Sequence, residues 1–198
     1  MKTVNMYTDG ACSGNQNEEN TGGWGCILEY AGREKELHGG EVNTTNNRME
    51  LSAPIAGLSA LKEKGLRVRI FSDSSYLVNC FRQGWYENWR KNGWKTSKKQ
   101  PVENRELWEQ LLSLTEGQTC EFYLVKGHLK LADAEGNALD ETAPALKKAY
   151  GAFCGHNGAF SFEEFYRIAG YNNRADDLAN EFIREHRAAS EASPEEPM

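Results

Sequence analysis

The sequence lacks several features that mark specialised classes of protein. Its 198 residues contain no apolar run near the ~20 residues that span a bilayer, and MKTVNMYTDG has no signal-peptide hydrophobic region. The five cysteines are odd in number, widely scattered and without a CxxC pair, unlike a disulfide framework or a thiolate metal site. We therefore expect reduced thiols and a cytoplasmic protein.

Charge is unevenly distributed along the chain. The net charge of −6 lacks the positive excess that is typical of nucleic-acid-binding proteins. The segment RKNGWKTSKK, residues 90–99, is nevertheless basic and has no acidic residue, whereas acids gather elsewhere, including ASEASPEEPM. Because a local basic stripe matters more than the sum of charges, nucleic acid stays open as a partner.

Hydrophobic patterning predicts an α/β fold. Two-residue alternation or short apolar runs indicate strands at residues 3–10, 24–30, 33–42, 67–73 and 119–128. Helical periodicity indicates helices at 46–65, 74–84, 101–117 and 169–187, and the Trp-rich segment 85–100 is assigned to neither class. This order predicts one domain, residues 1–187, with a mixed sheet covered by helices, and a disordered tail at 188–198.

Four acidic residues stand at expected strand ends or helix starts. Asp9 and Asp73 each end a strand, and the carboxyl ends of parallel strands are where open α/β sheets bind ligands. Glu50 lies near the start of the long helix, and Asp176 is placed in the first turn of the last helix. Each residue alone could serve only a helix N-terminus. Four acids at one edge would repel each other, which predicts bound cations such as Mg²⁺.

Seven motifs resemble type 1 ribonuclease H and follow that family's order. They are YTDGACSGN, TTNNRMEL, FSDSSY, GWYENWRKNGWKT, PVENRELW, LVKGH and NNRADDLAN, over residues 3–128 and 172–187. The resemblance implies a ribonuclease H-like fold, a five-stranded mixed sheet flanked by helices. It also implies two-metal hydrolysis of the RNA strand of an RNA–DNA hybrid, which leaves 5′-phosphate and 3′-hydroxyl ends.

The resemblance carries over the metal ligands Asp9, Glu50, Asp73 and Asp176. They would hold two Mg²⁺ ions, with Mn²⁺ as a substitute. Asp177 is the neighbouring rival of Asp176, but the NxxxD spacing from Asn172 favours Asp176. The capping of the helix after Asp73 is then left to the serines.

Further residues resemble the family's substrate contacts. Small polar side chains can sense 2′-hydroxyls in a minor groove, a role implied for Asn15, Asn46 and Asn47, with Cys12 contacting through its backbone. The alternative for Asn46 and Asn47 is helix capping. The remaining implied contacts are Thr45 and Asn104 for a DNA phosphate, Trp85 for DNA sugars, and Lys91 and Lys95 for phosphates. Phosphate contacts carry little sequence information, so we expect no sequence specificity.

The chain departs from the family at the catalytic histidine. His128 in LVKGH could move a proton at the leaving group, but 48 positions separate it from Asp176, against roughly ten in the family. The insertion, residues 129–171, contains two helical patterns, ETAPALKKAYGAF and SFEEFYRIAG, and a rival histidine, His156. The insertion could lengthen the substrate channel, bind a partner or cap the sheet edge. A second departure is Pro54, which predicts a kink or a loosened turn after Glu50.

Two other functions stay open at this stage. One is a hybrid-binding module that has lost catalysis, which a displaced Asp176 would favour. The other is a different two-metal nuclease on the same fold, such as a junction resolvase. We expect a monomer that binds an RNA–DNA hybrid, no membrane association, and no separate N-terminal hybrid-binding domain.

Overall fold

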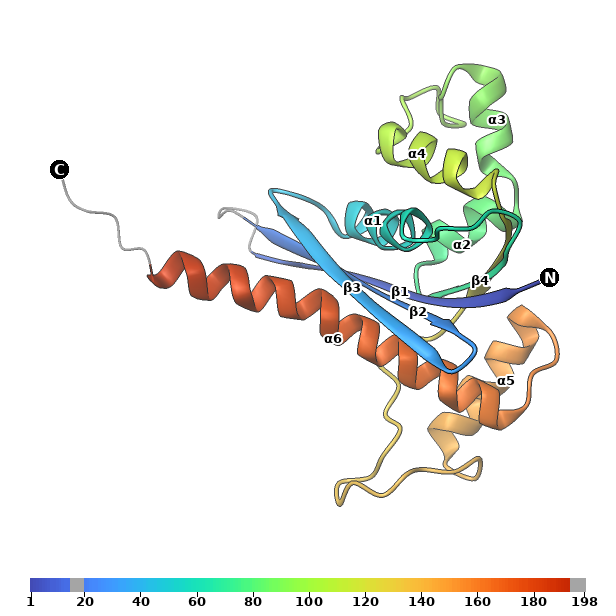
Figure 1. The fold of residues 1–198 in the computed structure, drawn as a ribbon, viewed down its shortest axis with the longest axis vertical. Helices are drawn as coiled ribbons and strands as arrows, with labels where there is room; N and C mark the ends of the chain where they lie inside the picture. Colours follow the sequence, from blue (N-terminus) through green and yellow to red (C-terminus); the bar gives the residue numbers. More distant parts are fainter. Residues whose placement is uncertain (15–19, 193–198) are drawn as a thin grey trace.

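The computed structural model describes residues 1–14 and 20–192, with side chains described to residue 189. Five strands form one sheet in the order β3-β2-β1-β4-β5, and helices cover both faces (Figure 1). The strands are β1 (Thr3–Ser13), β2 (Thr21–Tyr30), β3 (Arg33–Val42), β4 (Arg67–Ser72) and β5 (Thr119–Leu124). The helices are α1 (Asn46–Ser59), α2 (Ser75–Arg82), α3 (Trp85–Asn92), α4 (Arg105–Thr115), α5 (Pro144–Asn157) and α6 (Phe162–Ala192).

The sheet is mixed, as the sequence predicts. The central strand β1 runs antiparallel to β2, which runs antiparallel to β3. On its other side β1 runs parallel to β4, which runs parallel to β5. Thr8 lies opposite Ser72 in the β1–β4 register, so the residues that follow these two positions meet at one edge of the sheet.

Alternation along the strands supplies two separate cores. On one face, the apolar positions of β1 and β4, including Met6 and Ile70, pack with α1, α2 and α4 around the fully buried Trp108. On the other face, Tyr7 and Phe71 stack 5.2 Å apart and pack against α5 and α6. Figure 1 shows α1 and α6 on opposite sides of the sheet.

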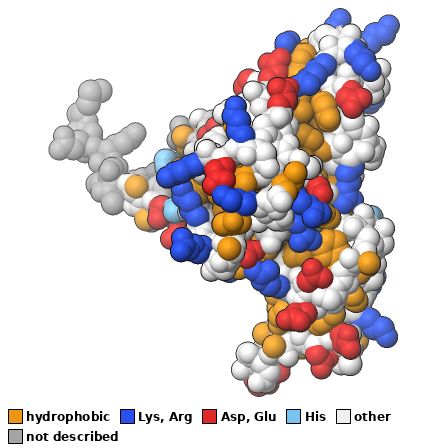
Figure 2. All heavy atoms as spheres, turned by 45° about the vertical axis from the view of Figure 1, so that its right-hand side comes forward, with side chains coloured by type: hydrophobic (Ala, Val, Ile, Leu, Met, Phe, Trp, Pro, Cys, Tyr) orange, Lys and Arg blue, Asp and Glu red, His pale blue; other side chains and the backbone are white. Residues whose placement is uncertain are grey.

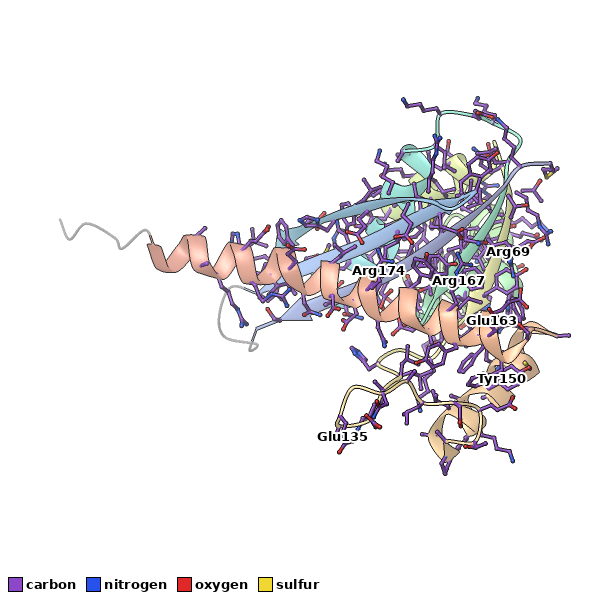
Figure 3. The ribbon with its side chains drawn as sticks, turned by 60° about the horizontal axis from the view of Figure 1, so that its bottom comes forward. Arg69, Glu135, Tyr150, Glu163, Arg167 and Arg174 are labelled. Atoms are coloured by element: carbon purple, nitrogen blue, oxygen red, sulfur yellow. The ribbon has the colours of Figure 1, made fainter. Side chains whose placement is uncertain are left out.

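Helix α6 is fixed to the sheet by ion pairs as well as by apolar contacts. Arg174 bridges Glu34 and Glu36 of β3, and Arg167 pairs with Glu29 of β2 at 3.0 Å. Figure 3 shows both arginines along the part of α6 that crosses the strands. These pairs hold the register of α6, and hence of every residue on it, relative to β2 and β3.

The insertion is structured and joins the second core. Leu146 and Phe153 of α5 pack with Phe165 of α6, each 4% exposed or less. The connecting loop between β5 and α5 projects away from the sheet, with Glu135 at its far end (Figure 3). The second helical pattern of the insertion and the last predicted helix are one helix, α6, of 31 residues. The prediction of two separate helices there is therefore wrong.

The structure differs from the sequence predictions at three other places. The segment 85–100 contains a helix, α3, that was not predicted; it begins and ends at Gly84 and Gly93, both with positive φ. Residues 188–192 belong to α6, so the predicted tail begins too early; residues 193–198 lie outside the described residues. Helix α1 continues unbroken through Pro54, and the kink stays a prediction.

No helix in the described ranges is long and apolar enough to cross a membrane.

Candidate active site

Three carboxylates meet where β4 ends beside β1. Asp9 lies within β1, one residue beyond the last position paired with β4, and β1 continues to Ser13, so the prediction that Asp9 ends a strand is wrong. Asp73 directly follows β4, and Glu50 comes from the second turn of α1. One oxygen from each of the three side chains lies within 4.8 Å of the others. Asp9 and Glu50 are 4% and 5% exposed, so the cluster is largely withdrawn from solvent.

Two local features explain why Asp73 is not needed as a helix cap and how Glu50 comes close to Asp9. Ser74 caps α2, because its hydroxyl accepts a hydrogen bond from the Leu77 N–H at 3.3 Å. Asp73 therefore has no capping role, as the sequence predicts. Gly10 lets α1 approach β1, since a Cβ at this position would lie 2.5 Å from the backbone nitrogen of Glu50.

Asp176 reaches the same edge from the middle of α6, and its predicted place in the first turn of a helix is wrong. Asp9 pairs with Gly25 of β2, and a Cβ on Gly25 would lie 2.1 Å from the carbonyl oxygen of Ala175. The backbone of α6 therefore crosses β2 in direct contact with this glycine. Asn180, one turn along, donates a hydrogen bond to Asp176 Oδ1 at 2.9 Å and orients the carboxylate.

Burial and mutual repulsion disfavour the charged forms of the clustered carboxyl groups. Burial, together with the neighbouring carboxylates, raises the pKa of Asp9, of Glu50 and of Asp73. Glu50 Oε2 and Asp73 Oδ1 are buried with no hydrogen-bond partner among the described residues. Unpaired, buried carboxylate oxygens at this spacing fit the oxygen ligands that Mg²⁺ prefers.

Comparison with known proteins identifies the family. A sequence model of RNase H matches residues 1–146. The chain belongs to the ribonuclease H family. It is 53% identical over 145 residues to ribonuclease H of Moorella thermoacetica, covering 73% of this chain and 91% of that one. It is 50% identical over 145 residues to ribonuclease H of Symbiobacterium thermophilum, covering 73% and 95%.

Solved structures agree with this assignment. LC9-RNase H1, a type 1 RNase H with the type 2 active-site motif, aligns with a TM-score of 0.59 and 29% identity, over 87% of this chain and 85% of that one. The native prototype foamy virus protease-reverse transcriptase aligns with a TM-score of 0.54 over 90% of this chain and 20% of that one, at 19% identity, a likeness of fold alone. The predicted resemblance to type 1 ribonuclease H and the predicted fold are confirmed.

The family match ends at residue 146, so the placement of Asp176 rests on its geometry. Asp176 raises the pKa of Asp9, Glu50 and Asp73, which places its charge beside all three. The rival Asp177 is exposed and is not part of the cluster. The structure thus brings Asp9, Glu50 and Asp73 together and places Asp176 beside them through its contact with His128.

His128 is the histidine beside the carboxylates. Its Nδ1 lies 3.3 Å from Asp176 Oδ2, and its charge acts to lower the pKa of Asp73. The loop that carries it is tied at both ends. Asn157 pairs with both backbone groups of Leu124, and Asn173 donates to the carbonyl of Leu129 at 2.8 Å. His156, the rival, lies on the last turn of α5 across a pocket from His128.

The predicted DNA-phosphate residues are linked through an arginine that the sequence reasoning did not single out. Thr45 caps α1 by accepting from the Arg48 N–H at 3.3 Å, and the Arg48 guanidinium donates to Asn104 Oδ1 at 3.4 Å. Arg48 directly follows the two asparagines in TTNNR. Its positive charge beside them is the sequence feature that could have indicated its place among these residues. Because Thr45 is the cap, Asn46 and Asn47 are not; both are exposed, and Asn46 donates to Glu50 Oε1 at 3.5 Å.

The remaining predicted contacts lie farther out. Cys12 is exposed near the end of β1, and Asn15 lies outside the described residues. Trp85 begins α3 and is half-buried, while Lys91 and Lys95 are exposed on and after that helix. Trp89 and Trp94 form a local core, because their rings lie 5.9 Å apart and Trp89 also packs on Trp108.

Proposed function

We propose that this enzyme hydrolyses the RNA strand of RNA–DNA hybrids, without sequence specificity, and leaves 5′-phosphate and 3′-hydroxyl ends. The observation that carries the proposal is the convergence of Asp9, Glu50, Asp73 and Asp176 at one sheet edge with His128 beside them. The substrate class follows from family membership, since relatives about 50% identical are named ribonuclease H.

The four carboxylates would hold two Mg²⁺ ions, with Mn²⁺ as a substitute. Bound divalent metal supplies positive charge for the leaving oxygen and lowers the pKa of a water that attacks phosphorus. The unpartnered oxygens of Glu50 and Asp73 offer ligand atoms that the protein itself leaves free. Asp9 accepts a hydrogen bond from the Gly10 N–H at 2.7 Å, which fixes its second oxygen toward the backbone.

His128 moves the proton in this proposal. Its imidazole is 74% exposed, so a substrate phosphate can reach it, and Asp176 orients it through Nδ1. A proton donated from the ring to the departing 3′-oxygen gives the 3′-hydroxyl end. The choice of His128 over His156 as the catalytic histidine rests on this contact.

The proposed contacts to the hybrid come from the start of α1 and from the segments that follow α2. The exposed Asn46 and Asn47 at the start of α1 can approach 2′-hydroxyls in the minor groove, and the resemblance to the family adds Cys12 and Asn15 as further contacts. Thr45, Asn104 and the bridging Arg48 form the phosphate contact for the DNA strand. Trp85, Lys91 and Lys95 extend this side along the duplex.

Cleavage of an end-labelled RNA–DNA hybrid in Mg²⁺ tests the proposal, with single-stranded RNA, RNA duplex and DNA duplex run in parallel. We expect cutting of the RNA strand of the hybrid alone, abolished by Asp73→Asn and by chelator. Ligation of the products tests the ends. Cutting of all-DNA substrates would instead indicate another two-metal nuclease, and hybrid binding without cutting would indicate a binding module.

A further inference from the structure

A pocket of about 450 Å³ opens beside the carboxylate cluster, between the His128 loop and helix α5. Asp73 and His128 line it from the side of the cluster, and Ala152 and His156 line it from the insertion. The volume is within the range of small-ligand sites, about 300–1,000 Å³. The insertion therefore adds a wall to the region where the scissile phosphate would lie.

The pocket presents hydrogen-bond donors that have no partner in the described part of the chain. Lys126, Ser75 and His156 all line it, and none of their side chains has a hydrogen bond or ion pair among the described residues. An ammonium, a hydroxyl and an imidazole are groups that bind phosphate oxygens. Asp73 is the pocket's one acidic lining residue in the described chain, and its charge is directed to the proposed metal site.

The insertion wall is held in place rather than loosely apposed. Asn157 donates to the Leu124 carbonyl at 2.7 Å and accepts from the Leu124 N–H at 3.0 Å, which continues the pairing of β5. Arg82 of α2 donates to the carbonyl oxygen of His156 at 2.9 Å and to Asn157 Oδ1 at 2.7 Å. The last turn of α5, and with it His156, is thus fixed to the strand that leads into the His128 loop.

We propose that this pocket binds a phosphate of the cleaved strand, adjacent to the scissile phosphate, and that His156 is a substrate contact supplied by the insertion. The inference rests on the proposed function, because the strand is identified by its passage over the carboxylates. Neighbouring phosphates of one strand lie a single nucleotide apart, and Asp73 and His128 border both the cluster and the pocket. The proposed contacts of Thr45, Arg48 and Asn104 are assigned to the DNA strand, so this pocket is assigned to the other strand.

Charge on the insertion supports a contact confined to the pocket. The loop that leads to α5 is acidic, with Glu135, Asp140 and Glu141 exposed and Asp133 half-buried. The lower projection in Figure 2 carries several acidic side chains. Such charges disfavour nucleic acid on this loop, whereas the pocket offers Lys126 and His156 as contacts.

Two substitutions to glutamate on the same helix form the central test. Ala152→Glu places a negative charge in the pocket, whereas Ala145→Glu places the same side chain on an exposed position of α5 outside it. We expect Ala152→Glu to raise KM for the hybrid roughly tenfold or more, and His156→Ala to raise it roughly three- to tenfold. Ala145→Glu should match the wild type, and thermal melting checks that all three variants fold.

A neutral linkage then identifies the phosphate. In hybrids whose RNA strand carries one methylphosphonate, stepped along the positions beside the cleavage site, one position should weaken wild-type binding. The same position should have no further effect in His156→Ala, because the contact is already lost. The slope of log KM against log salt should also fall by about one in Ala152→Glu.

Each outcome decides one question. If the wild type does not cleave hybrids, the proposed function fails, and the pocket proposal fails with it. If it cleaves hybrids but Ala152→Glu and Ala145→Glu are equivalent, the pocket proposal alone is wrong. An increase in KM for Ala152→Glu without any position-specific methylphosphonate effect would show general repulsion and would also overturn the phosphate assignment.

Discussion

Nδ1 of His128 lies 3.3 Å from Oδ2 of Asp176, although the insertion separates the two residues by 48 positions. The pair couples the loop after β5 to the middle of α6. The contact places both residues at the candidate site, which their separation along the chain does not indicate.

The pair predicts the effect of removing the imidazole. His128→Ala should lower kcat roughly 100-fold with a smaller change in KM, because proton transfer is lost while the carboxylates stay in place. Steady-state cleavage of a hybrid in Mg²⁺ measures both constants. His38→Ala, which removes an exposed imidazole from β3, is the control. Equal kcat values for the two variants would exclude His128 from the reaction.

Two adjacent aspartates on α6 give a matched comparison. Asp176→Asn should reduce cleavage to background, because it removes a carboxylate from the cluster. Asp177→Asn makes the same chemical change one residue away on the exposed side and should retain cleavage. Isothermal titration with Mn²⁺ gives a second readout, in which Asp176→Asn alone weakens binding. If Asp177→Asn lost activity and Asp176→Asn kept it, Asp177 rather than Asp176 would be the fourth carboxylate of the site.

The raised carboxyl pKa values predict how pH affects the metal-free protein. Asp9 has a pKa of about 8 when folded, above its ordinary value, so the folded state binds its proton more tightly than the unfolded state. The stabilisation is complete below the unfolded pKa, about 4, and is lost as pH rises toward the folded pKa. The melting temperature in chelator should therefore fall between pH 5 and 8, and Mg²⁺ should restore it. Asp9→Asn should flatten this pH dependence, whereas an unchanged profile would argue against repulsion in the cluster.

Gly25 provides a test of how α6 is positioned. Gly25→Ala would place a methyl group 2.1 Å from the Ala175 carbonyl oxygen. We expect a loss of roughly 1–3 kcal/mol in the free energy of unfolding, together with reduced cleavage, because Asp176 moves with the helix. Urea unfolding and hybrid cleavage measure the two effects. Gly117→Ala, where φ is not positive and a Cβ would meet only the Lys64 side chain at 3.7 Å, controls for glycine replacement alone.

The sequence predicts much of this structure because its signals are local. The alternation of Met6 and Tyr7 predicts a two-sided strand, and Asp9 and Asp73 at expected strand ends predict a common site, although β1 continues past Asp9. Ser74 caps α2 as expected from its place before an apolar helical pattern. All five strands and the cluster follow from patterns of this kind.

Other features depend on contacts between distant segments. Nothing near Gly158–Ser161 indicates that the following helix continues for 31 residues, because that helix is stabilised by β2, β3 and α5. Helix α3 has eight residues, none of them buried, and it is flanked by Gly84 and Gly93 in left-handed conformation, so its packing depends on neighbouring segments. The link from Arg48 to Asn104 spans two helices and has no signature in either.

The single helix α6 also sets the order in which the molecule becomes active during synthesis. Its first turns pack through Phe165 with the insertion, and Asp176 follows on the same rigid rod. The last carboxylate therefore reaches the first strand only after the chain through α6 has left the ribosome, and the insertion docks through the same helix. A nascent chain that already holds Asp9, Glu50 and Asp73 would lack a complete metal site, so maturation of the nuclease is coupled to completion of its fold.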